Sequence, residues 1–182
     1  MKILLVVDAQ NDFMPGGALP VPGGNEIVPI INSIRDKFDR VIFTKDWHPA
    51  EHCSFVSQKG PWPVHCVQGT RGAEFHKDLI VKPNDIIIVK GNDPAIDSYS
   101  GFYDNEKKKA TELLSFLKKD KLWVCGLALE YCVKFTVLDA LSEKYETRVI
   151  IDACRGINYD NIQKAQEEMM DAGALLTSSK GI

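Results

Sequence analysis

Cys132 is the residue best placed in this sequence to act as a nucleophile. It follows a short apolar run at 122–125 and Gly126, and it falls near the start of the next helical pattern. A cysteine in the first turn of a helix meets free backbone N–H groups and the positive end of the helix dipole, which favour the thiolate over the thiol. We therefore predict a catalytic nucleophile at Cys132, against the alternative of a buried thiol that only packs.

Two charged residues, Asp8 and Lys90, also stand directly after expected strands, at 3–7 and 85–89. The carboxyl ends of parallel strands share one edge of a sheet, so both side chains should meet Cys132 there. A carboxylate can take the proton of an attacking thiol and later protonate the leaving group, while a lysine stabilises the charged nucleophile. The hypothesis is a catalytic group of Asp8, Lys90 and Cys132; the alternatives are a turn cap and a solvated lysine.

Asp46 and His48 follow the expected strand at 41–44 and are two residues apart, so in extended chain their side chains point the same way. His65 lies further along the same loop and could complete a set of two imidazoles and a carboxylate. Such a set suits zinc, iron or manganese, and we expect one divalent metal ion, zinc before the other two. His52 could be a fourth ligand or a donor outside the ligand set, and His76 has no assigned role.

Three aromatic residues, Phe13, Trp62 and Tyr103, lie in polar loops instead of an apolar pattern. They could simply pack locally. The sharper prediction is that they form the walls of a site for a flat, ring-shaped substrate.

The elements that must position these residues alternate between strands and helices. Strands are expected at 3–7, 41–44, 85–89, 122–125, 149–151 and 175–177, and helices from Asn25 as N-cap, at 104–118 with Ala110, Leu113, Leu114 and Leu117 buried, at 130–142 and at 160–172. Such alternation predicts right-handed crossovers and a Rossmann-like, three-layer α/β/α fold with a mostly parallel six-stranded sheet, in one domain spanning 1–182.

The loop between the second and third strands is about forty residues long and contains all four histidines, a length that indicates function. No G-x-G-x-x-G follows a strand and no G-x-x-x-x-G-K-[ST] occurs, so two common nucleotide-binding fingerprints are missing.

Composition limits the partners. A net charge of −3 does not favour nucleic acid or a membrane surface, so we expect a small-molecule substrate, and a homo-oligomer is compatible with the sequence. The apolar run at 3–7 is too short for a signal peptide or a membrane span, which favours a cytoplasmic protein. Five cysteines make an odd number, so a disulfide framework is not expected.

Five stretches carry a resemblance to a known family. They are VDAQNDF at 7–13, DWHP with HCSF at 46–55, PWPVHCVQGTRGAEF at 61–75, VKG with DSYSGFYD at 89–104, and GLALEYCV at 126–133. Together they resemble the nicotinamidases, also called pyrazinamidases, of the isochorismatase-like cysteine hydrolases. The resemblance implies an isochorismatase-like fold, a catalytic triad of Asp8, Lys90 and Cys132, metal ligands at Asp46, His48 and His65, and a pyridine ring held between Phe13 and Trp62.

The resemblance also implies a cis peptide between Leu127 and Ala128, with the N–H groups of Ala128 and Cys132 forming an oxyanion hole. Two positions depart from many relatives. Leu129-Glu130 stands where they carry Thr-Asp, and Gly101 stands where they carry alanine. These departures could alter the packing of the turn and the substrate preference.

The expected function is metal-dependent hydrolysis of nicotinamide, and also of pyrazinamide, through a cysteine thioester, in NAD salvage. One alternative is another amidase of the superfamily that acts on a carbamoyl or acyclic amide. The other is a non-catalytic domain that binds a metal or ligand and merely buries Cys132.

Overall fold

The computed structural model describes residues 1–108, 111–118 and 120–182. Its centre is one sheet of six strands in the order β3-β2-β1-β4-β5-β6, in which every neighbouring pair is parallel. The strands are β1 (Lys2–Val7), β2 (Arg40–Asp46), β3 (Ile86–Lys90), β4 (Lys121–Gly126), β5 (Glu146–Cys154) and β6 (Leu175–Thr177). The predicted six-stranded sheet is confirmed, and it is parallel throughout.

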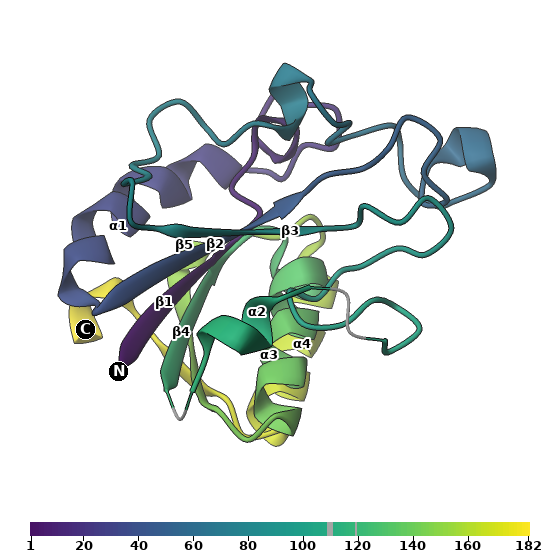
Figure 1. Cartoon of the computed structure of the whole chain (residues 1–182). Coiled ribbons are helices and arrows are strands. Elements are labelled where there is room, and N and C mark those ends of the chain that lie inside the picture. Colours follow the sequence, from purple (N-terminus) through teal and green to yellow (C-terminus); the bar gives the residue numbers. More distant parts are fainter. Residues whose placement is uncertain (109–110, 119) are drawn as a thin grey trace.

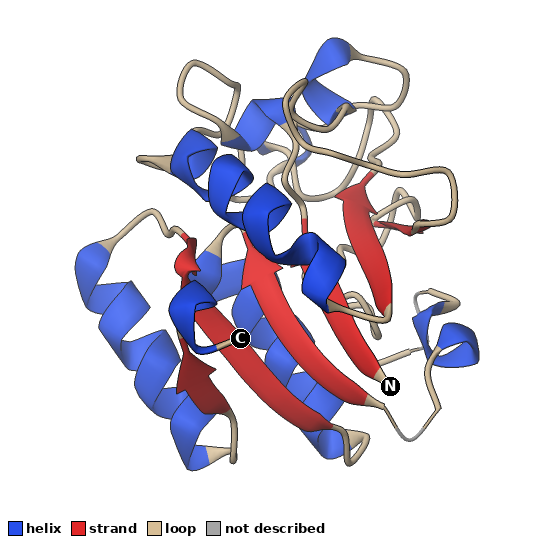
Figure 2. Ribbon diagram, turned by 90° about the vertical axis from the view of Figure 1, so that its left-hand side faces the viewer, coloured by secondary structure: helices blue, strands red, loops and turns tan. Residues whose placement is uncertain are grey.

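Helices cover both faces of this sheet, so the three-layer prediction is also confirmed. They are α1 (Ile27–Ile34), α2 (Leu113–Phe116), α3 (Lys134–Ser142) and α4 (Tyr159–Asp171). Helix α1 lies on one face, and α3 and α4 lie on the other (Figures 1 and 2). The chain moves outward in one direction from β1 to β2 and in the opposite direction from β4 to β5, so right-handed crossovers place the connecting helices on opposite faces.

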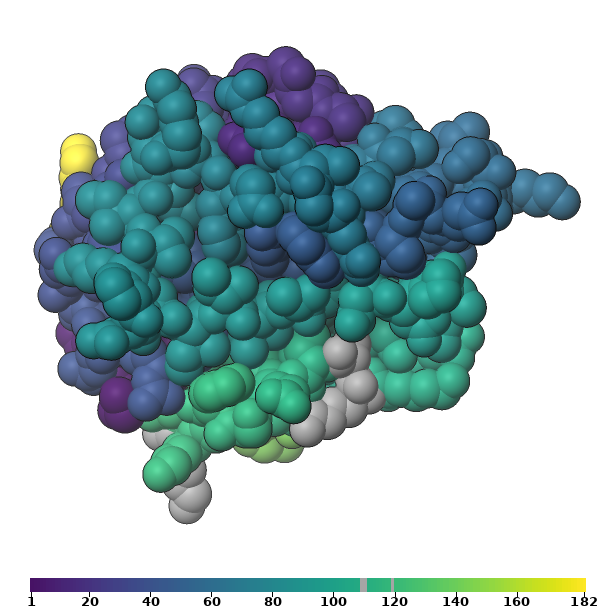
Figure 3. Space-filling model, turned by 45° about the horizontal axis from the view of Figure 1, so that its top comes forward, coloured from purple at the N-terminus to yellow at the C-terminus, as the bar shows by residue number. Residues whose placement is uncertain are grey.

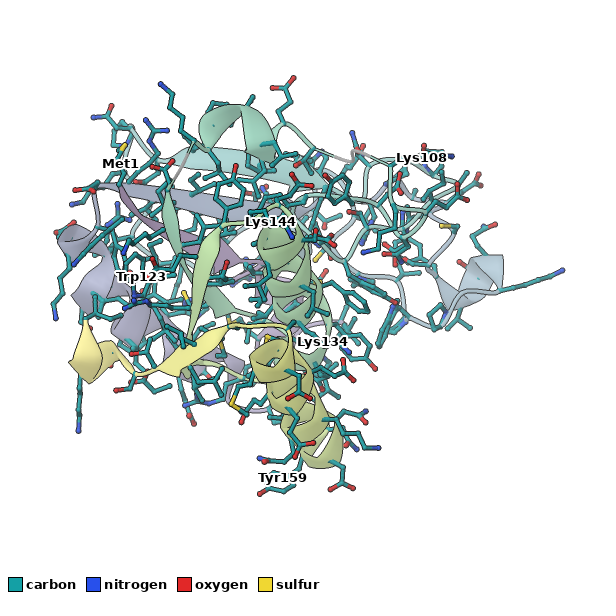
Figure 4. The ribbon with its side chains drawn as sticks, turned by 90° about the horizontal axis from the view of Figure 1, so that it is seen from below. Met1, Lys108, Trp123, Lys134, Lys144 and Tyr159 are labelled. Atoms are coloured by element: carbon teal, nitrogen blue, oxygen red, sulfur yellow. The ribbon has the colours of Figure 1, made fainter. Side chains whose placement is uncertain are left out.

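The core is formed by apolar side chains of the strands that face the helices on both sides of the sheet. Residues 3–7 of β1 are almost completely buried, as expected for a central strand covered on both sides. Helix α1 buries Ile27, Val28, Ile31 and Ile34 against the sheet, a stripe with helical spacing. On the other face, Lys134 of α3 lies beside α4 and pairs with Glu168 at 2.8 Å (Figure 4).

The predicted helix at 104–118 is mostly wrong. In the described part of this range only α2 is α-helical. Leu113 and Leu117 are buried as predicted, Leu114 is only half-buried, and the expected Ala110 lies outside the described residues. Asp104 explains the difference, since its Oδ1 accepts hydrogen bonds at 2.9 Å from the backbone N–H groups of Glu106 and Lys108. An aspartate that binds nearby backbone amides in this way competes with helix formation.

Other boundaries differ where tertiary contacts decide them. Asn25 does not cap α1; it lies in a 3-10 turn, and the N-cap position is Glu26, which makes no side-chain cap. The predicted helix at 130–142 begins with a π-helical turn, Leu129–Val133, before α3. Strand β5 extends beyond the predicted 149–151 to include Asp152, which accepts a hydrogen bond from the backbone of Ser179.

The long loop between β2 and β3 folds across one end of the sheet and covers much of the surface in Figure 3. Isolated bridges fix it, pairing Gln10 with Phe75 and His48 with Val67. Within the described ranges, no helix is both long and apolar enough to cross a membrane.

Candidate active site

The strand order reverses between β1 and β4, and in open parallel sheets ligands bind beyond the carboxyl ends of the strands at such a point. Asp8 follows β1 directly, and the turn after β4 leads to Cys132. Lys90 is the last residue of β3 and lies opposite Asp46, the last residue of β2. Four reactive side chains from four different strands therefore meet at one rim.

The three residues predicted to be catalytic are in contact. The Lys90 ammonium lies 2.9 Å from Asp8 Oδ2 and 3.5 Å from Cys132 Sγ. It also lies 2.5 Å from Asp46 Oδ1 and donates to the carbonyl oxygen of Ser98 at 3.0 Å. Lys90 and Asp8 are both completely buried. One ammonium thus links two carboxylates and a thiol in a dry site.

Burial and charge act against each other in this group. Burial would lower the pKa of Lys90, but Asp46 and Asp8 outweigh it and hold that pKa well above its usual range. For Asp46, burial is outweighed by Lys90 and His48, and the pKa of the carboxyl is lowered. For Asp8, burial prevails over Lys90 and the pKa is raised. Asp46 is therefore the permanent anion, and Asp8 is the carboxylate that more readily takes a proton.

Cys132 differs from the expectation of a favoured thiolate. It is the fourth residue of the π-helical turn, and burial raises the pKa of its thiol far above the usual value despite the nearby Lys90. With its pKa raised, the thiol would need a base to take its proton during an attack on a substrate. Asp8 Oδ2 is suited to this, because Thr44 donates to the other oxygen, Oδ1, at 2.6 Å, and Oδ2 has no well-aligned hydrogen bond among the described residues.

Gln10 holds the backbone at the end of β2. Its side chain donates to the carbonyl oxygen of Asp46 at 2.7 Å and accepts from the N–H of Asp46 at 2.8 Å, and it also donates to Ala73 at 2.8 Å. The side chain is completely buried. It supplies two backbone hydrogen bonds to Asp46 of the kind that a neighbouring strand would otherwise make. It fixes the backbone from which the Asp46 carboxylate extends.

We expect Gln10→Ala to lower the free energy of unfolding by about 2–3 kcal/mol, because it leaves buried backbone groups of Asp46 and Ala73 without partners. Urea denaturation measures this change. Gln58→Ala, in an exposed turn of the loop between β2 and β3, is the control and should change stability by less than about 0.5 kcal/mol. An equal loss in both variants would contradict the bracing role.

The three predicted metal ligands converge. One ligand atom from each of Asp46, His48 and His65 lies within 4.8 Å of the other two, and all three residues are buried. The Nδ1 atoms of His48 and His65 lie 2.7 Å from the carbonyl oxygens of Gly91 and Pro63. These contacts orient each ring and leave Nε2 for a metal, an arrangement typical of metal-binding histidines. The three residues form a candidate site for one divalent ion.

His52 lies beside this set. Its ring stacks on His48 with centroids 4.0 Å apart, and its Nδ1 is 2.7 Å from the hydroxyl of Ser54. Its Nε2 is buried and has no hydrogen-bond partner among the described residues. One possible ligand atom from each of His48, His52 and Asp97 also lies within 4.8 Å of the other two. Asp97 was not predicted, although it lies in one of the stretches that carry the family resemblance.

A pocket opens next to Cys132. Two of the three predicted aromatic residues, Phe13 and Trp62, line it. Tyr103 does not, and its hydroxyl donates to Glu143 near the surface. His76 is also outside the pocket. Sequence reasoning missed five lining residues, which are Leu19, Asp97, Tyr99, Tyr131 and Ile157. Three of them carried a signal, since Asp97, Tyr99 and Tyr131 lie in stretches that carry the family resemblance.

The turn before Cys132 contains a cis peptide between Leu127 and Ala128, as the resemblance implied. Ala128 lines the pocket together with Cys132. Within the described residues, its backbone N–H has no acceptor. A free N–H next to a nucleophile can stabilise negative charge on a substrate oxygen. The site as a whole offers a thiol, a base, a cation and an amide donor beside a flat pocket, the set that acyl transfer requires.

Comparison with known proteins agrees with this geometry. The family model for the isochorismatase domain matches residues 2–181. A nicotinamidase of Escherichia coli is 44% identical, with 96% of this chain and 93% of the relative covered. A structure of a nicotinamidase and pyrazinamidase from Acinetobacter baumannii superposes with a TM-score of 0.95 at 38% identity, covering 99% and 97% of the two chains.

A third relative is a pyrazinamidase of Pyrococcus horikoshii, solved in complex with zinc. It is 41% identical, its TM-score is 0.89, and 97% of this chain and 98% of that chain are covered. In all three comparisons the similarity covers more than nine-tenths of both chains. The chain belongs to the isochorismatase family, among its nicotinamidases and pyrazinamidases.

Proposed function

We propose that this chain, as a single domain, hydrolyses nicotinamide to nicotinate and ammonia, and pyrazinamide to pyrazinoate, in NAD salvage. The observation that carries the proposal is the Cys132 thiol at 3.5 Å from Lys90, which in turn contacts Asp8, at the base of an aromatic pocket. The pyridine ring lies between Phe13 and Trp62, with its amide carbon toward Cys132.

The metal site faces the same pocket, because Asp46, His48 and His65 all line it. These three residues would hold one divalent ion, and zinc suits two imidazoles and a carboxylate. When bound, the ion supplies positive charge that can hold the ring nitrogen and acidify a water molecule. The zinc in the Pyrococcus horikoshii relative supports this assignment.

The protein's own residues account for the proton transfers. Asp8 accepts the thiol proton as Cys132 Sγ attacks the amide carbon, and the Lys90 ammonium stabilises the charge that develops. The N–H groups of Ala128 and Cys132 bind the oxyanion. Asp8 then protonates the departing ammonia, which leaves a thioester on Cys132. Asp8 next takes a proton from water as the water attacks this thioester, and nicotinate and the thiol are released.

The aromatic lining of the pocket and the three-residue metal site favour this reaction over the two alternatives. An acyclic or carbamoyl amide has no ring to fill the space between Phe13 and Trp62, and a merely packed cysteine does not require a buried lysine in contact with it. Ammonia release from nicotinamide, pyrazinamide and N-carbamoylsarcosine by the purified protein with zinc tests the proposal. A preference for N-carbamoylsarcosine would overturn it.

Removing the metal should lower kcat/KM for nicotinamide by about 100-fold or more, because the ring would lose its charged anchor. His65→Ala should have a similar effect that added zinc does not reverse, whereas zinc should restore the chelated wild type. The measurement is the rate of ammonia release, together with bound metal by mass spectrometry. His76→Ala removes a histidine of the same loop outside the site and should keep both metal and rate. Full activity after chelation would refute the metal role.

A further inference from the structure

The loop at 155–158, between β5 and α4, forms one wall of the pocket. Its Ile157 lines the pocket together with the aromatic residues and Cys132. The π-helical turn that carries Cys132 also holds this loop, since the N–H of Leu129 donates to the carbonyl oxygen of Arg155 at 2.9 Å. The pocket wall and the nucleophile are therefore parts of one hydrogen-bonded unit.

Glu130 makes the strongest link in this unit. Its side chain is only 4% exposed, and Oε1 accepts hydrogen bonds from the backbone N–H groups of Ile157 at 2.7 Å and Asn158 at 2.9 Å. Both donors lie at the N-terminus of the 13-residue helix α4, where a negative charge is favourable. Glu130 has no part in the proton transfers proposed above, so its burial needs another explanation.

The second carboxylate oxygen lies tightly against the same loop. A Cβ added to Gly156 would come within 2.4 Å of Glu130 Oε2 and within 2.5 Å of Ile162 Cγ1. Oε2 is buried and has no hydrogen-bond partner among the described residues. Oε1 thus accepts hydrogen bonds from two backbone amides of the loop. Oε2 lies against Gly156, where there is no room for a side chain. The carboxylate contacts three consecutive loop residues, 156–158.

We propose that Glu130 is a positioning residue that fixes Ile157 at the pocket wall and thereby sets which ring substituents the substrate can carry. This inference rests on the proposed function, and it adds which residues determine the substrate specificity of that reaction. Ile157 is 37% exposed and sits at the margin of the pocket, so it is held by its backbone more than by surrounding side chains. Loss of the carboxylate would free it to move away from the ring.

The test compares kcat/KM for ring-methylated nicotinamides with that for nicotinamide. In Glu130→Ala two buried amides lose their acceptor, and this ratio should rise by about tenfold, the range for one methyl group in an apolar pocket, with KM changing more than kcat. Ile157→Ala should raise the ratio similarly. Because both changes open the same wall, the double variant should show little further change. Glu130→Gln keeps an amide oxygen in place of Oε1 and should restore the wild-type ratio.

Two further arms separate positioning from simple loss of stability. Amide hydrogen exchange at 155–158 should be faster in Glu130→Ala. It should be unchanged in Glu167→Ala, which removes an exposed carboxylate from helix α4. Gly156→Ala keeps Glu130 but pushes the loop away from it, and it should shift the ratio in the same direction. This variant decides the question if Glu130→Ala does not fold.

The inference is overturned if Glu130→Ala slows all substrates equally, if the effects of Glu130→Ala and Ile157→Ala multiply, or if exchange at 155–158 does not change. Wild type that releases no ammonia from nicotinamide would instead overturn the proposed function. Hydrogen exchange would then still show whether Glu130 holds the loop.

Discussion

Cys132→Ala is expected to lower kcat for ammonia release from nicotinamide by on the order of 10⁴-fold or more, to the background rate. The thiol is the group that would form the bond to the amide carbon, and no other cysteine lines the pocket in the described structure. The side chain is small and 6% exposed, so thermal stability should change little. A steady-state ammonia assay and a melting curve measure the two effects separately.

The matched control is Cys125→Ala, which removes another buried thiol from strand β4 without touching the pocket. Burial and Cys154 raise the pKa of the Cys125 thiol, and Lys90 is not among its charged neighbours. This variant should keep the wild-type kcat and lose about 1 kcal/mol of stability. If Cys132→Ala kept more than a tenth of the wild-type rate, the thioester mechanism would be wrong.

Lys90→Met should reduce both activity and stability, with a loss of about 3–5 kcal/mol in the free energy of unfolding. The ammonium is completely buried and is the only cation that both Asp8 and Asp46 contact within the described residues. Its removal leaves Asp8 without a counter-charge and leaves Asp46 with only His48 beside it, at 3.6 Å. Urea denaturation in the presence of chelator isolates this effect from metal binding, and kcat should fall at least about 1,000-fold.

The double variant Lys90→Met with Asp8→Asn separates electrostatics from packing. It removes one of the uncompensated carboxylates and should recover part of the lost stability, but no activity. Lys121→Met is the control, because Lys121 is exposed and its pair with Glu146 at 2.8 Å is a surface ion pair worth at most about 1 kcal/mol. Wild-type stability in Lys90→Met would show that the buried group does not hold the two anions.

The candidate site could be predicted largely because parallel strands end together. Once residues 3–7 and 85–89 were assigned as strands, Asp8 and Lys90 had to reach the same rim, and the turn after 122–125 had to join them. The structure confirms this meeting. The Asp46–His48 spacing predicted the metal set for a similar reason, since alternate residues of an extended chain share a side.

The sequence predicted that the thiolate form of Cys132 is favoured, and nothing in the sequence could have shown that this prediction was wrong. The pKa of a thiol depends on how deeply the folded chain buries it, and a single helix start reports only the local dipole. The helix at 104–118 failed likewise, because its apolar spacing was real but the side chain of Asp104 bound the backbone amides that the helix needed.

The parallel sheet, the residues at its rim and the family could all be predicted from the sequence, because strand patterns, strand ends and the order of motifs can be read along the chain. The folded structure was needed to show that burial raises the pKa of the Cys132 thiol, and that Glu130 accepts a hydrogen bond from the backbone N–H of Ile157. Residues 130 and 157 are brought together by the packing of α4 against the turn after β4. Contacts of that kind depend on the whole fold and leave no periodicity in the sequence.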